Sequence, residues 1–246
     1  MPNVEYNADG IQLTSSEECG IFVLSLDRNE NVVNPDFVGA LSASINIVEC
    51  ASHPKALVII GRGKFFSNGL DLKFMLSTPQ GTSPLIESFW RLLGRILVMD
   101  CRTVAAINGH AFGAGLFLAL ACDYRLMRTK RGFVNFPELN LGMRLAKGFA
   151  EISKAKLSPE TLRDGVLTGR RYGSTEAIRT GLVDFECPFD ELESRAIVIA
   201  EEGLPENLGA VNFDAQSFRQ MKIELYTDAY RALSMGKVDA EPESRL

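Results

Sequence analysis

The chain has 246 residues, of which 46% are hydrophobic and 23% are charged, and its formal net charge is −5. This profile is typical of a soluble globular chain that forms one large domain or two small ones. The acidic balance disfavours a nucleic-acid surface, and no run of about 18 apolar residues predicts a membrane span.

Apolar runs and helical patterns alternate in the first half of the chain. The runs "IFVLSLD" (21–27), "ALVIIGR" (56–62) and "TVAAING" (103–109) are short, rich in β-branched residues and bounded by Gly, Asn or Asp, so they predict buried strands. Apolar residues at helical spacing predict helices over 34–51 and 83–100. The order strand, helix, strand, helix predicts an α/β fold. From about residue 145 onward the sequence becomes rich in helical patterns.

The five cysteines are scattered and show neither CxxC nor Cys/His metal spacing. They are therefore interpreted as reduced thiols, and neither a zinc site nor a disulfide framework is predicted: Cys19, Cys50, Cys101, Cys122 and Cys187. No metal site of any kind is expected. The first residues lack the basic head and apolar stretch of a secretory signal.

Two turns that follow predicted strands indicate a place where backbone amides point outward. In "KFFSNGLDL" (64–72), Gly69 permits a sharp bend, after which the N–H of Leu70 is exposed. In "HAFGAGLFLALACDY", Gly113 and Ala114 precede unbroken helix formers, so the first amides of a helix lack partners. Together the two turns predict an oxyanion hole, which stabilises negative charge on a carbonyl oxygen.

Each turn alone is also explained by ordinary close packing. Neither matches the dinucleotide fingerprint GxGxxG or the P-loop, because no third glycine and no Gly-Lys-Ser/Thr follow. Nucleotide-phosphate binding is therefore disfavoured.

Four motifs in succession, "ALVIIGRGKFFSNGLDLKFM", "TVAAINGHAFGAGLFLALACDYRLM", "GFVNFPELNLGM" and "LTGRRYGSTEAIRTGLVD", resemble the crotonase, or enoyl-CoA hydratase/isomerase, superfamily. The resemblance runs from about residue 20 to 200 and is greatest to the peroxisomal Δ3,Δ2-enoyl-CoA isomerases. It implies a spiral of ββα units with a C-terminal helical module. The corresponding division is a crotonase-like core over 1–195 and a helical oligomerisation segment with a tail over 196–246, which assembles trimers or hexamers.

The resemblance also assigns a site. It implies that the N–H groups of Leu70 and Ala114 hold the thioester oxygen of an acyl-CoA, and that Glu138 in "NFPELNLG" is the catalytic carboxylate. Coenzyme A is then part of the substrate, and no separate cofactor is expected. Further residues are expected to line the substrate or coenzyme A: Ser67, Asn68, Gly69, Asp71, Lys73, Gly113 and Phe117.

One carboxylate favours double-bond migration over hydration. Hydratases of this family usually carry two glutamates, and Phe117 stands where the first is expected. Adding water divides proton tasks between paired carboxylates, whereas moving a double bond needs one base that removes a proton from C2 of a 3-enoyl thioester and returns it at C4. Phe117 is also expected to exclude water and raise the pKa of Glu138.

Two alternatives remain open at this point. One is a hydratase or other crotonase-type lyase or hydrolase that uses Glu138 alone, and the other is an acyl-CoA-binding protein without turnover. A hydrolytic triad is not supported, because neither His53 nor His110 has an obvious Ser or Cys partner. Asp123 is expected to cap local backbone. Several aromatic or long apolar residues are interpreted as either core or acyl tunnel: Phe74, Met75, Trp90, Phe112 and Phe136.

The last three residues, Ser244-Arg245-Leu246, differ by one basic exchange from the Ser-Lys-Leu peroxisomal signal. The polar, proline-containing segment before them is expected to be exposed, as a receptor-read signal must be. We therefore expect binding to a peroxisomal import receptor and a peroxisomal location, with the cytoplasm as the alternative.

Overall fold

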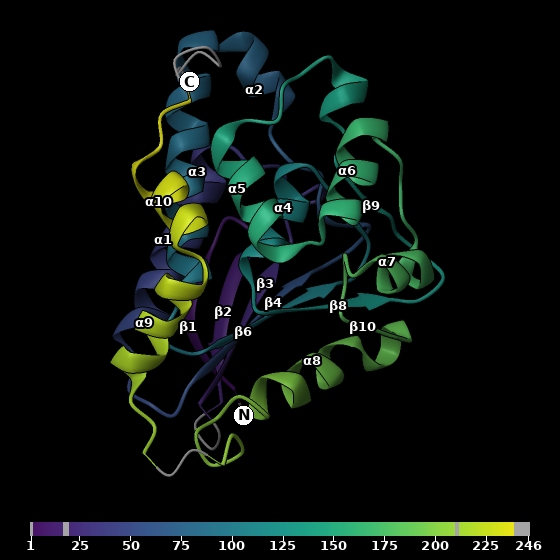
Figure 1. Ribbon diagram of the computed structural model, residues 1–246. Coiled ribbons are helices and arrows are strands. Elements are labelled where there is room, and N and C mark those ends of the chain that lie inside the picture. The colour runs from purple at the N-terminus through teal and green to yellow at the C-terminus, as the bar shows by residue number, and fades with distance from the viewer. Residues whose placement is uncertain (1, 17–19, 210–211, 239–246) are drawn as a thin grey trace.

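The computed structural model describes residues 2–16, 20–209 and 212–238, which form two sheets surrounded by helices (Figure 1). The seven-stranded sheet has the order β1-β2-β3-β4-β6-β8-β10 and the three-stranded sheet the order β5-β7-β9. The large sheet contains β1 (Asn3–Ala8), β2 (Ile11–Ser15), β3 (Ile21–Leu26), β4 (Ala56–Gly61), β6 (Arg102–Ile107), β8 (Tyr124–Arg128) and β10 (Phe185–Cys187). The small sheet contains β5 (Phe65–Ser67), β7 (His110–Phe112) and β9 (Val134–Asn135).

The helices follow the strands in a repeating order. They are α1 (Pro35–Cys50), α2 (Leu72–Ser77), α3 (Thr82–Leu97), α4 (Ala114–Ala121), α5 (Lys147–Lys156), α6 (Pro159–Thr168), α7 (Ser174–Thr180), α8 (Leu192–Glu201), α9 (Ala215–Leu225) and α10 (Thr227–Met235), with 3-10 turns η1 (Pro79–Gly81), η2 (Glu138–Leu141) and η3 (Phe189–Glu191).

Three successive units place one strand in each sheet before the chain enters a helix. In each of the pairs β4 and β5, β6 and β7, and β8 and β9, the first strand joins the large sheet and the second joins the small sheet. Neighbouring strands from successive units are parallel in both sheets. The predicted α/β class and the repeated ββα units are therefore confirmed.

The central strands of the large sheet are buried on both faces, whereas the edge strand β1 is largely exposed. One face packs on α8 through residues such as Val58, Val104 and Ile199, and the other faces the main core with α1, α3 and α4. In Figure 1, α8 lies below the sheet while most other helices lie above it. Every residue of β4 is buried, which explains why its sequence is continuously apolar rather than alternating.

Local signals determine where the predicted helices begin. Asn34 caps α1 by accepting a hydrogen bond from the N–H of Phe37 (3.0 Å), and Pro35 occupies the first turn. The strands predicted at 21–27, 56–62 and 103–109 and the helices predicted at 34–51 and 83–100 correspond to β3, β4, β6, α1 and α3.

The segment 124–133 does not form a β-hairpin. β8 pairs with β6 and β10, whereas β9 pairs with β7 in the other sheet. The turn between β8 and β9 therefore carries the chain from one sheet to the other. The expected division of the chain at residues 195 and 196 stays a prediction, and it falls inside α8.

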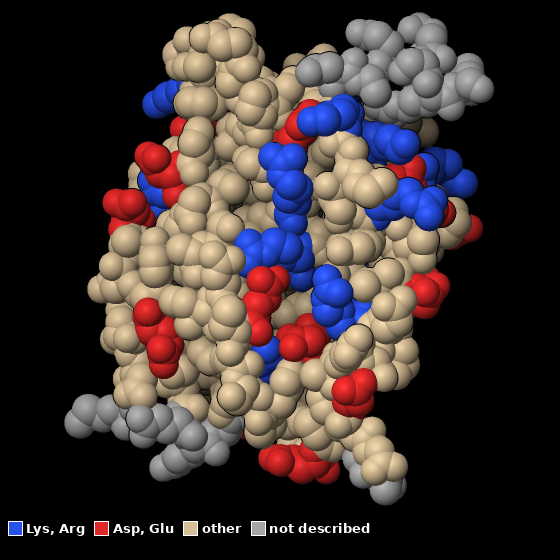
Figure 2. Space-filling view, turned by 90° about the vertical axis from the view of Figure 1, so that its left-hand side faces the viewer, with Lys and Arg blue, Asp and Glu red and all other residues tan. Residues whose placement is uncertain are grey.

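The surface carries both charge signs. Figure 2 shows the side that lies to the left in Figure 1, where Lys and Arg are interspersed with Asp and Glu among uncharged residues. Neither a membrane-spanning helix nor a metal cluster is found in the described part of the chain. Within residues 2–16, 20–209 and 212–238, no helix is long and apolar enough to cross a membrane. Over the same ranges, no cluster of three or more His, Cys, Asp or Glu side chains is arranged to hold a metal ion.

A buried ion pair attaches the C-terminal helices to the large sheet. The Nζ of Lys222, on α9, lies 2.6 Å from Asp123 Oδ2 and donates to the carbonyl of Cys101 at 2.8 Å. Asp123 Oδ2 also accepts from the N–H of Thr103 (2.8 Å), so this carboxylate binds the backbone of β6, 20 residues away in the sequence, and not the local backbone as expected. The same carboxylate therefore joins α9, β6 and the end of α4.

Replacing Lys222 should weaken this attachment strongly. In Lys222→Met, Asp123 keeps its charge in a buried place without its cation, and we expect a loss of about 3 kcal/mol in the free energy of unfolding. Urea unfolding of the variant checks this. The exposed Lys154→Met, which removes a surface pair with Glu151, serves as control and should change stability by less than about 0.5 kcal/mol. Equal effects of the two substitutions would contradict the account.

Candidate active site

A small cavity of about 60 Å³ lies at the carboxyl ends of the three strands of the small sheet. Parallel strands end at the same edge, so the turns that follow β5, β7 and β9 meet there. The cavity is lined by Asn68, Gly69, Leu70, Leu72, Phe112, Gly113, Ala114, Pro137, Glu138, Leu141 and Met143. The two turns and the carboxylate selected from the sequence are thus brought to one place.

The turn after β5 directs the N–H of Leu70 away from the protein's own acceptors. Gly69 has φ +88°, and the parallel bridge to Val33 uses the carbonyl of Gly69 and the N–H of Asp71. In a parallel bridge these two groups face the partner strand, so the N–H of the residue between them faces the other way. The amide of Leu70 is therefore available at the cavity.

The turn after β7 does the same for Ala114. Gly113 has φ +49° and precedes α4, of which Ala114 is the first residue. The first amides of a helix have no acceptor within the helix and lie at the positive end of its dipole. The N–H of Ala114 therefore favours a negatively charged oxygen nearby.

The two amides are held close together by direct backbone contact. A Cβ atom placed on Gly69 would lie 3.4 Å from the nitrogen of Ala114 and 2.6 Å from the carbonyl oxygen of Phe112. A Cβ atom on Gly115 would lie 2.3 Å from the carbonyl oxygen of Ser67. Only glycine permits such approaches, and together they bring the turn that carries Leu70 close to the start of α4 at Ala114.

Glu138 begins η2 beside the second turn. A Cβ atom on Gly113 would lie 3.8 Å from Glu138 Oε1, which places the carboxylate next to the residue that precedes Ala114. Its other oxygen, Oε2, is buried and has no hydrogen-bond partner within the described part of the chain. Burial raises the pKa of Glu138, opposed by a hydrogen bond with its own backbone. A carboxylate of this kind is suited to exchange a proton with a ligand.

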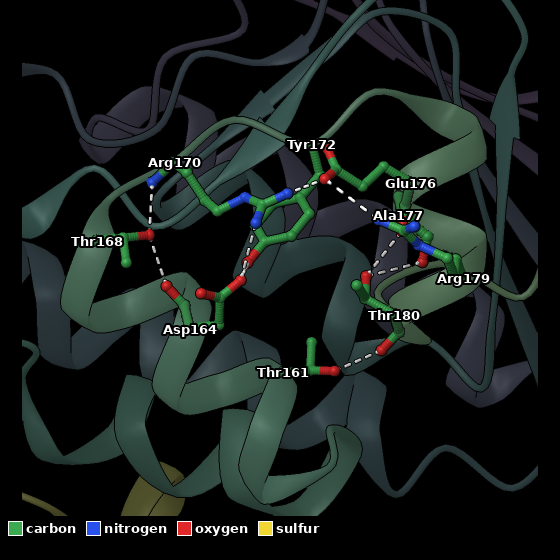
Figure 3. Close-up of polar contacts among 9 residues, drawn as sticks. All are labelled: Thr161, Asp164, Thr168, Arg170, Tyr172, Glu176, Ala177, Arg179 and Thr180. Carbon is green, nitrogen blue, oxygen red and sulfur yellow. Dashed lines mark hydrogen bonds and ion pairs between the residues drawn. The ribbon is translucent and has the colours of Figure 1, made fainter.

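A network behind β9 fixes the strand that leads to Glu138. Val134 and Tyr172 exchange two backbone hydrogen bonds of 3.0 and 2.9 Å. The buried Tyr172 donates its hydroxyl to Asp164 (3.0 Å), and Arg170 pairs with both Asp164 and Glu176 (Figure 3). Burial, followed by the bond to Asp164, raises the pKa of Tyr172 to about 12, so the hydroxyl stays protonated and donating.

Two amide side chains complete this support on either side of Glu138. Asn135 and Asn140 both donate to the carbonyl of Gly169, at 3.3 and 3.0 Å. Asn135 also accepts, through its main-chain carbonyl, the N–H of Gly113 (3.2 Å). The segment that carries Glu138 and the turn at Gly113 are therefore joined by the same set of hydrogen bonds.

The structure places the other predicted residues differently. Asn68, Gly69 and Gly113 line the cavity, and their expected contact with the substrate stays a prediction. Ser67 lies beneath it, where its hydroxyl donates to Asn31 (2.7 Å) and accepts from the amide of Gly69 (3.2 Å). Ser67 therefore shapes the turn.

The remaining three predicted residues lie on α2 or in the core. Asp71 caps α2 by accepting from the N–H of Phe74 (3.0 Å), and Lys73 is exposed on the same helix. Phe117 is fully buried and stacks on Phe149, with ring centroids 4.3 Å apart. An apolar stack thus occupies the position at which a second glutamate is expected in hydratases.

Sequence reasoning missed several residues of the site. Leu72, Pro137, Leu141 and Met143 line the cavity. Leu72 and Leu141 belong to a helix and a 3-10 turn too short for a periodic pattern, and Pro137 and Met143 lie on either side of that turn. It also missed Asn31, a buried residue whose amide donates to the carbonyls of Leu26, Phe65 and Phe66 at 3.0 to 3.1 Å. No spacing in the sequence distinguishes this buried asparagine from an exposed one.

The positions of the aromatic and histidine residues show which of them lie at the cavity and which lie in the core or elsewhere. Trp90 and Phe136 belong to the main core, whereas Phe112 lines the cavity. His53 contacts Asp100 (3.0 Å), and His110 stacks on Phe133 at the opposite end of the small sheet from Glu138.

Solved structures share this architecture. A structure described as an enoyl-CoA isomerase of Mycobacterium tuberculosis has a TM-score of 0.82 and 26% identity, covering 93% of this chain and 96% of that chain. Human mitochondrial delta3-delta2-enoyl-CoA isomerase has a TM-score of 0.82 and 20% identity, covering 92% and 86%, and so supports the fold alone. The fold is therefore that of the crotonases, with ββα units and C-terminal helices, as expected.

The sequence comparisons define the family. The family model for enoyl-CoA hydratase/isomerase matches residues 16–232. Enoyl-CoA delta isomerase 2, peroxisomal, of Arabidopsis thaliana is 30% identical over 217 residues, covering 85% of this chain and 89% of that protein. Carnitinyl-CoA dehydratase of Escherichia coli K12 is 31% identical over 195 residues, covering 76% and 72%. This chain belongs to the enoyl-CoA hydratase/isomerase family, whose substrates are acyl-CoA thioesters.

The close backbone contact at Gly69 is open to a direct test. In Gly69→Ala, the new Cβ atom meets both the unfavourable φ and the carbonyl of Phe112, so we expect a loss of at least about 3 kcal/mol in the free energy of unfolding. Gly181→Ala is the matched control, since Gly181 has φ +74° and open space around it, and it should lose about 1 kcal/mol. Urea unfolding measures both. Similar losses would show that the contact does not constrain the turn.

Proposed function

We propose that this protein is a Δ3,Δ2-enoyl-CoA isomerase of fatty acid β-oxidation, which shifts the double bond of a 3-enoyl-CoA to the 2-trans position. The observation that carries the proposal is the placement of one carboxylate, Glu138, beside two converging amides, with Phe117 in the hydrophobic core. The similarity to peroxisomal enoyl-CoA delta isomerases of Arabidopsis thaliana supports the same reaction.

Glu138 acts as the single base. Its carboxylate removes a proton from C2 of the bound 3-enoyl thioester, and negative charge moves to the thioester oxygen. The amides of Leu70 and Ala114 donate to that oxygen, and each such donor contributes on the order of 3 kcal/mol to stabilising the intermediate. The protonated Glu138 then returns the proton to C4, and the double bond lies between C2 and C3.

The surroundings of Glu138 favour this shuttle. Its unpartnered, buried Oε2 has no competing donor within the described residues, and the raised pKa makes the protonated form accessible between the two steps. The aromatic stack of Phe117 on Phe149 leaves no second carboxylate on α4 to orient a water molecule. The site therefore has a group for proton transfer but lacks the second carboxylate that water addition would use.

Coenzyme A enters as part of the substrate, and no separate cofactor takes part. We propose that Asn68 and the α2 residues Asp71 and Lys73 lie along its path, with the exposed Lys73 near the negatively charged nucleotide end. Ser67, Gly69 and Gly113 contribute by shaping the two turns.

We further propose a homotrimer or a hexamer located in the peroxisome. The candidate import signal, Ser244-Arg245-Leu246, lies outside the described residues. Two Arabidopsis thaliana relatives are described as peroxisomal, which supports an import receptor as a partner of this chain.

Removing the proposed base should abolish isomerisation. For Glu138→Gln, we expect kcat for 3-hexenoyl-CoA to fall by at least about 100-fold, because the amide cannot accept the proton. Ultraviolet absorbance of the conjugated product measures the rate. Glu206→Gln, at an exposed position, is the control and should retain full activity.

The same assay separates the alternatives. Mass spectrometry of the product in ¹⁸O water reports hydration, and a thiol reagent reports release of free CoA. Conjugation without added oxygen supports the isomerase, whereas oxygen incorporation or thiol release at comparable rates would make the protein a hydratase or a hydrolase. Tight binding of acyl-CoA with no turnover, unchanged in Glu138→Gln, would indicate a binding protein.

The pH dependence should report the burial of Glu138. Because the base must be deprotonated and its pKa lies above the ordinary glutamate value of 4.5, kcat/KM should rise with pH and reach half its maximum above pH 4.5. Measurement from pH 4 to 8 on the folded enzyme checks this. A profile that is already level at pH 4.5 would contradict the proposed role of burial.

A further inference from the structure

A second, larger hollow lies between α5 and α6. It has a volume of about 400 Å³, and its walls are formed mainly by aliphatic side chains, including Leu145, Leu157, Leu162, Val166 and Leu167. Leu167 is 68% exposed even though it is a leucine on a regular helix. We call this hollow the α5–α6 groove. Its surface suits an alkyl chain better than a polar ligand, because apolar walls gain free energy only by covering apolar surface.

One end of the groove adjoins the catalytic cavity. Leu157 and Pro159 line the groove at the short connection from α5 to α6, and Leu145 and Leu167 line it near the start of α5 and the end of α6. Asn140, within η2, donates to the carbonyl of Gly169, which caps the end of α6 (3.0 Å). The end of the groove at Leu145 and Leu167 is therefore next to the turn that carries Glu138.

A single chain segment lines both hollows. Leu141 and Met143 line the catalytic cavity, and Leu145 lines the groove. Two residues of extended chain span at most about 7 Å, so the two hollows approach each other closely along this segment. Met143 is tied to the start of η2 by its N–H, which donates to the carbonyl of Glu138 (2.8 Å). Met143, whose side chain is flexible, therefore lies on the chain segment that joins the cavity to the groove.

We propose that the acyl chain of the substrate passes Met143 and lies in the α5–α6 groove, so that the enzyme acts on long-chain 3-enoyl thioesters. The inference rests on the proposed function, because it takes the thioester to be held at Leu70 and Ala114. The catalytic cavity, at about 60 Å³, cannot enclose a long alkyl chain by itself. The groove supplies the missing apolar volume.

Binding of saturated acyl-CoA tests the groove without turnover. For the wild-type protein, calorimetry should show affinity rising by roughly fourfold per added methylene between C8 and C12, as expected for burial of CH₂ groups. Ala150→Trp places an indole in the groove. It should reduce the affinity for the C16 thioester by at least 30-fold and leave that for the C4 thioester within twofold.

A second, milder variant tests the groove even if the tryptophan variant does not fold. Leu167→Gln changes an exposed side chain and should weaken C16 binding by about tenfold. Leu225→Gln, at a leucine of α9 that is 70% exposed, is the matched control and should leave the chain-length dependence unchanged. Light scattering gives the mass of each variant.

The outcomes distinguish the groove from the reaction. Isomerisation of 3-hexenoyl-CoA together with the same chain-length dependence in wild type and both groove variants would overturn the groove and leave the isomerase standing. Chain-length dependence that both variants reduce, without any isomerisation, would support the groove and reject the reaction. A fall in assembly mass in the groove variants with unchanged chain-length dependence would show that another copy covers this face, and would also overturn the proposal.

Discussion

The site depends on backbone segments that approach each other more closely than any side chain permits. The end of β5 lies against the start of α4, where a Cβ atom on Gly115 would meet the carbonyl of Ser67 at 2.3 Å. The turn after β5 lies against the end of β7 in the same way, at Gly69 and Phe112. These two contacts place the amides of Leu70 and Ala114 side by side, and all the proposed chemistry follows from that placement.

The rest of the fold maintains these contacts. Each ββα unit delivers one strand to the small sheet, so the turns that carry Leu70, Ala114 and Glu138 are equivalent places in three successive units. The Tyr172 network and the two asparagines that bind Gly169 hold the third unit against the end of α6, and the hydrogen bond from the N–H of Gly113 to the carbonyl of Asn135 joins it to the second unit. In the proposed reaction the scaffold positions the thioester oxygen, and side chains such as Glu138 and Phe117 decide what happens to the held thioester.

Those parts of the fold and site could be predicted from the sequence in which an apolar pattern is long or in which the backbone conformation requires a particular residue type. The strands β3, β4 and β6 and the helices α1 and α3 have clear apolar periods, and Gly69 and Gly113 mark turns because of their backbone freedom. The small sheet could not be predicted, since its strands are two or three residues long and owe their existence to tertiary packing. Sequence likewise gave no direction for Ser67, whose hydroxyl turns inward, or for Met143, whose role depends on where η2 meets α5.

The central claim is that one base carries a proton from C2 to C4 beside a held thioester oxygen. The most direct test is a single-turnover reaction of 3-hexenoyl-CoA deuterated at C2, with the position of the label in the product read by mass spectrometry and NMR. The account predicts that a substantial share of the deuterium appears at C4 with no oxygen gained from water. Complete loss of the label to solvent together with incorporation of water oxygen would contradict it.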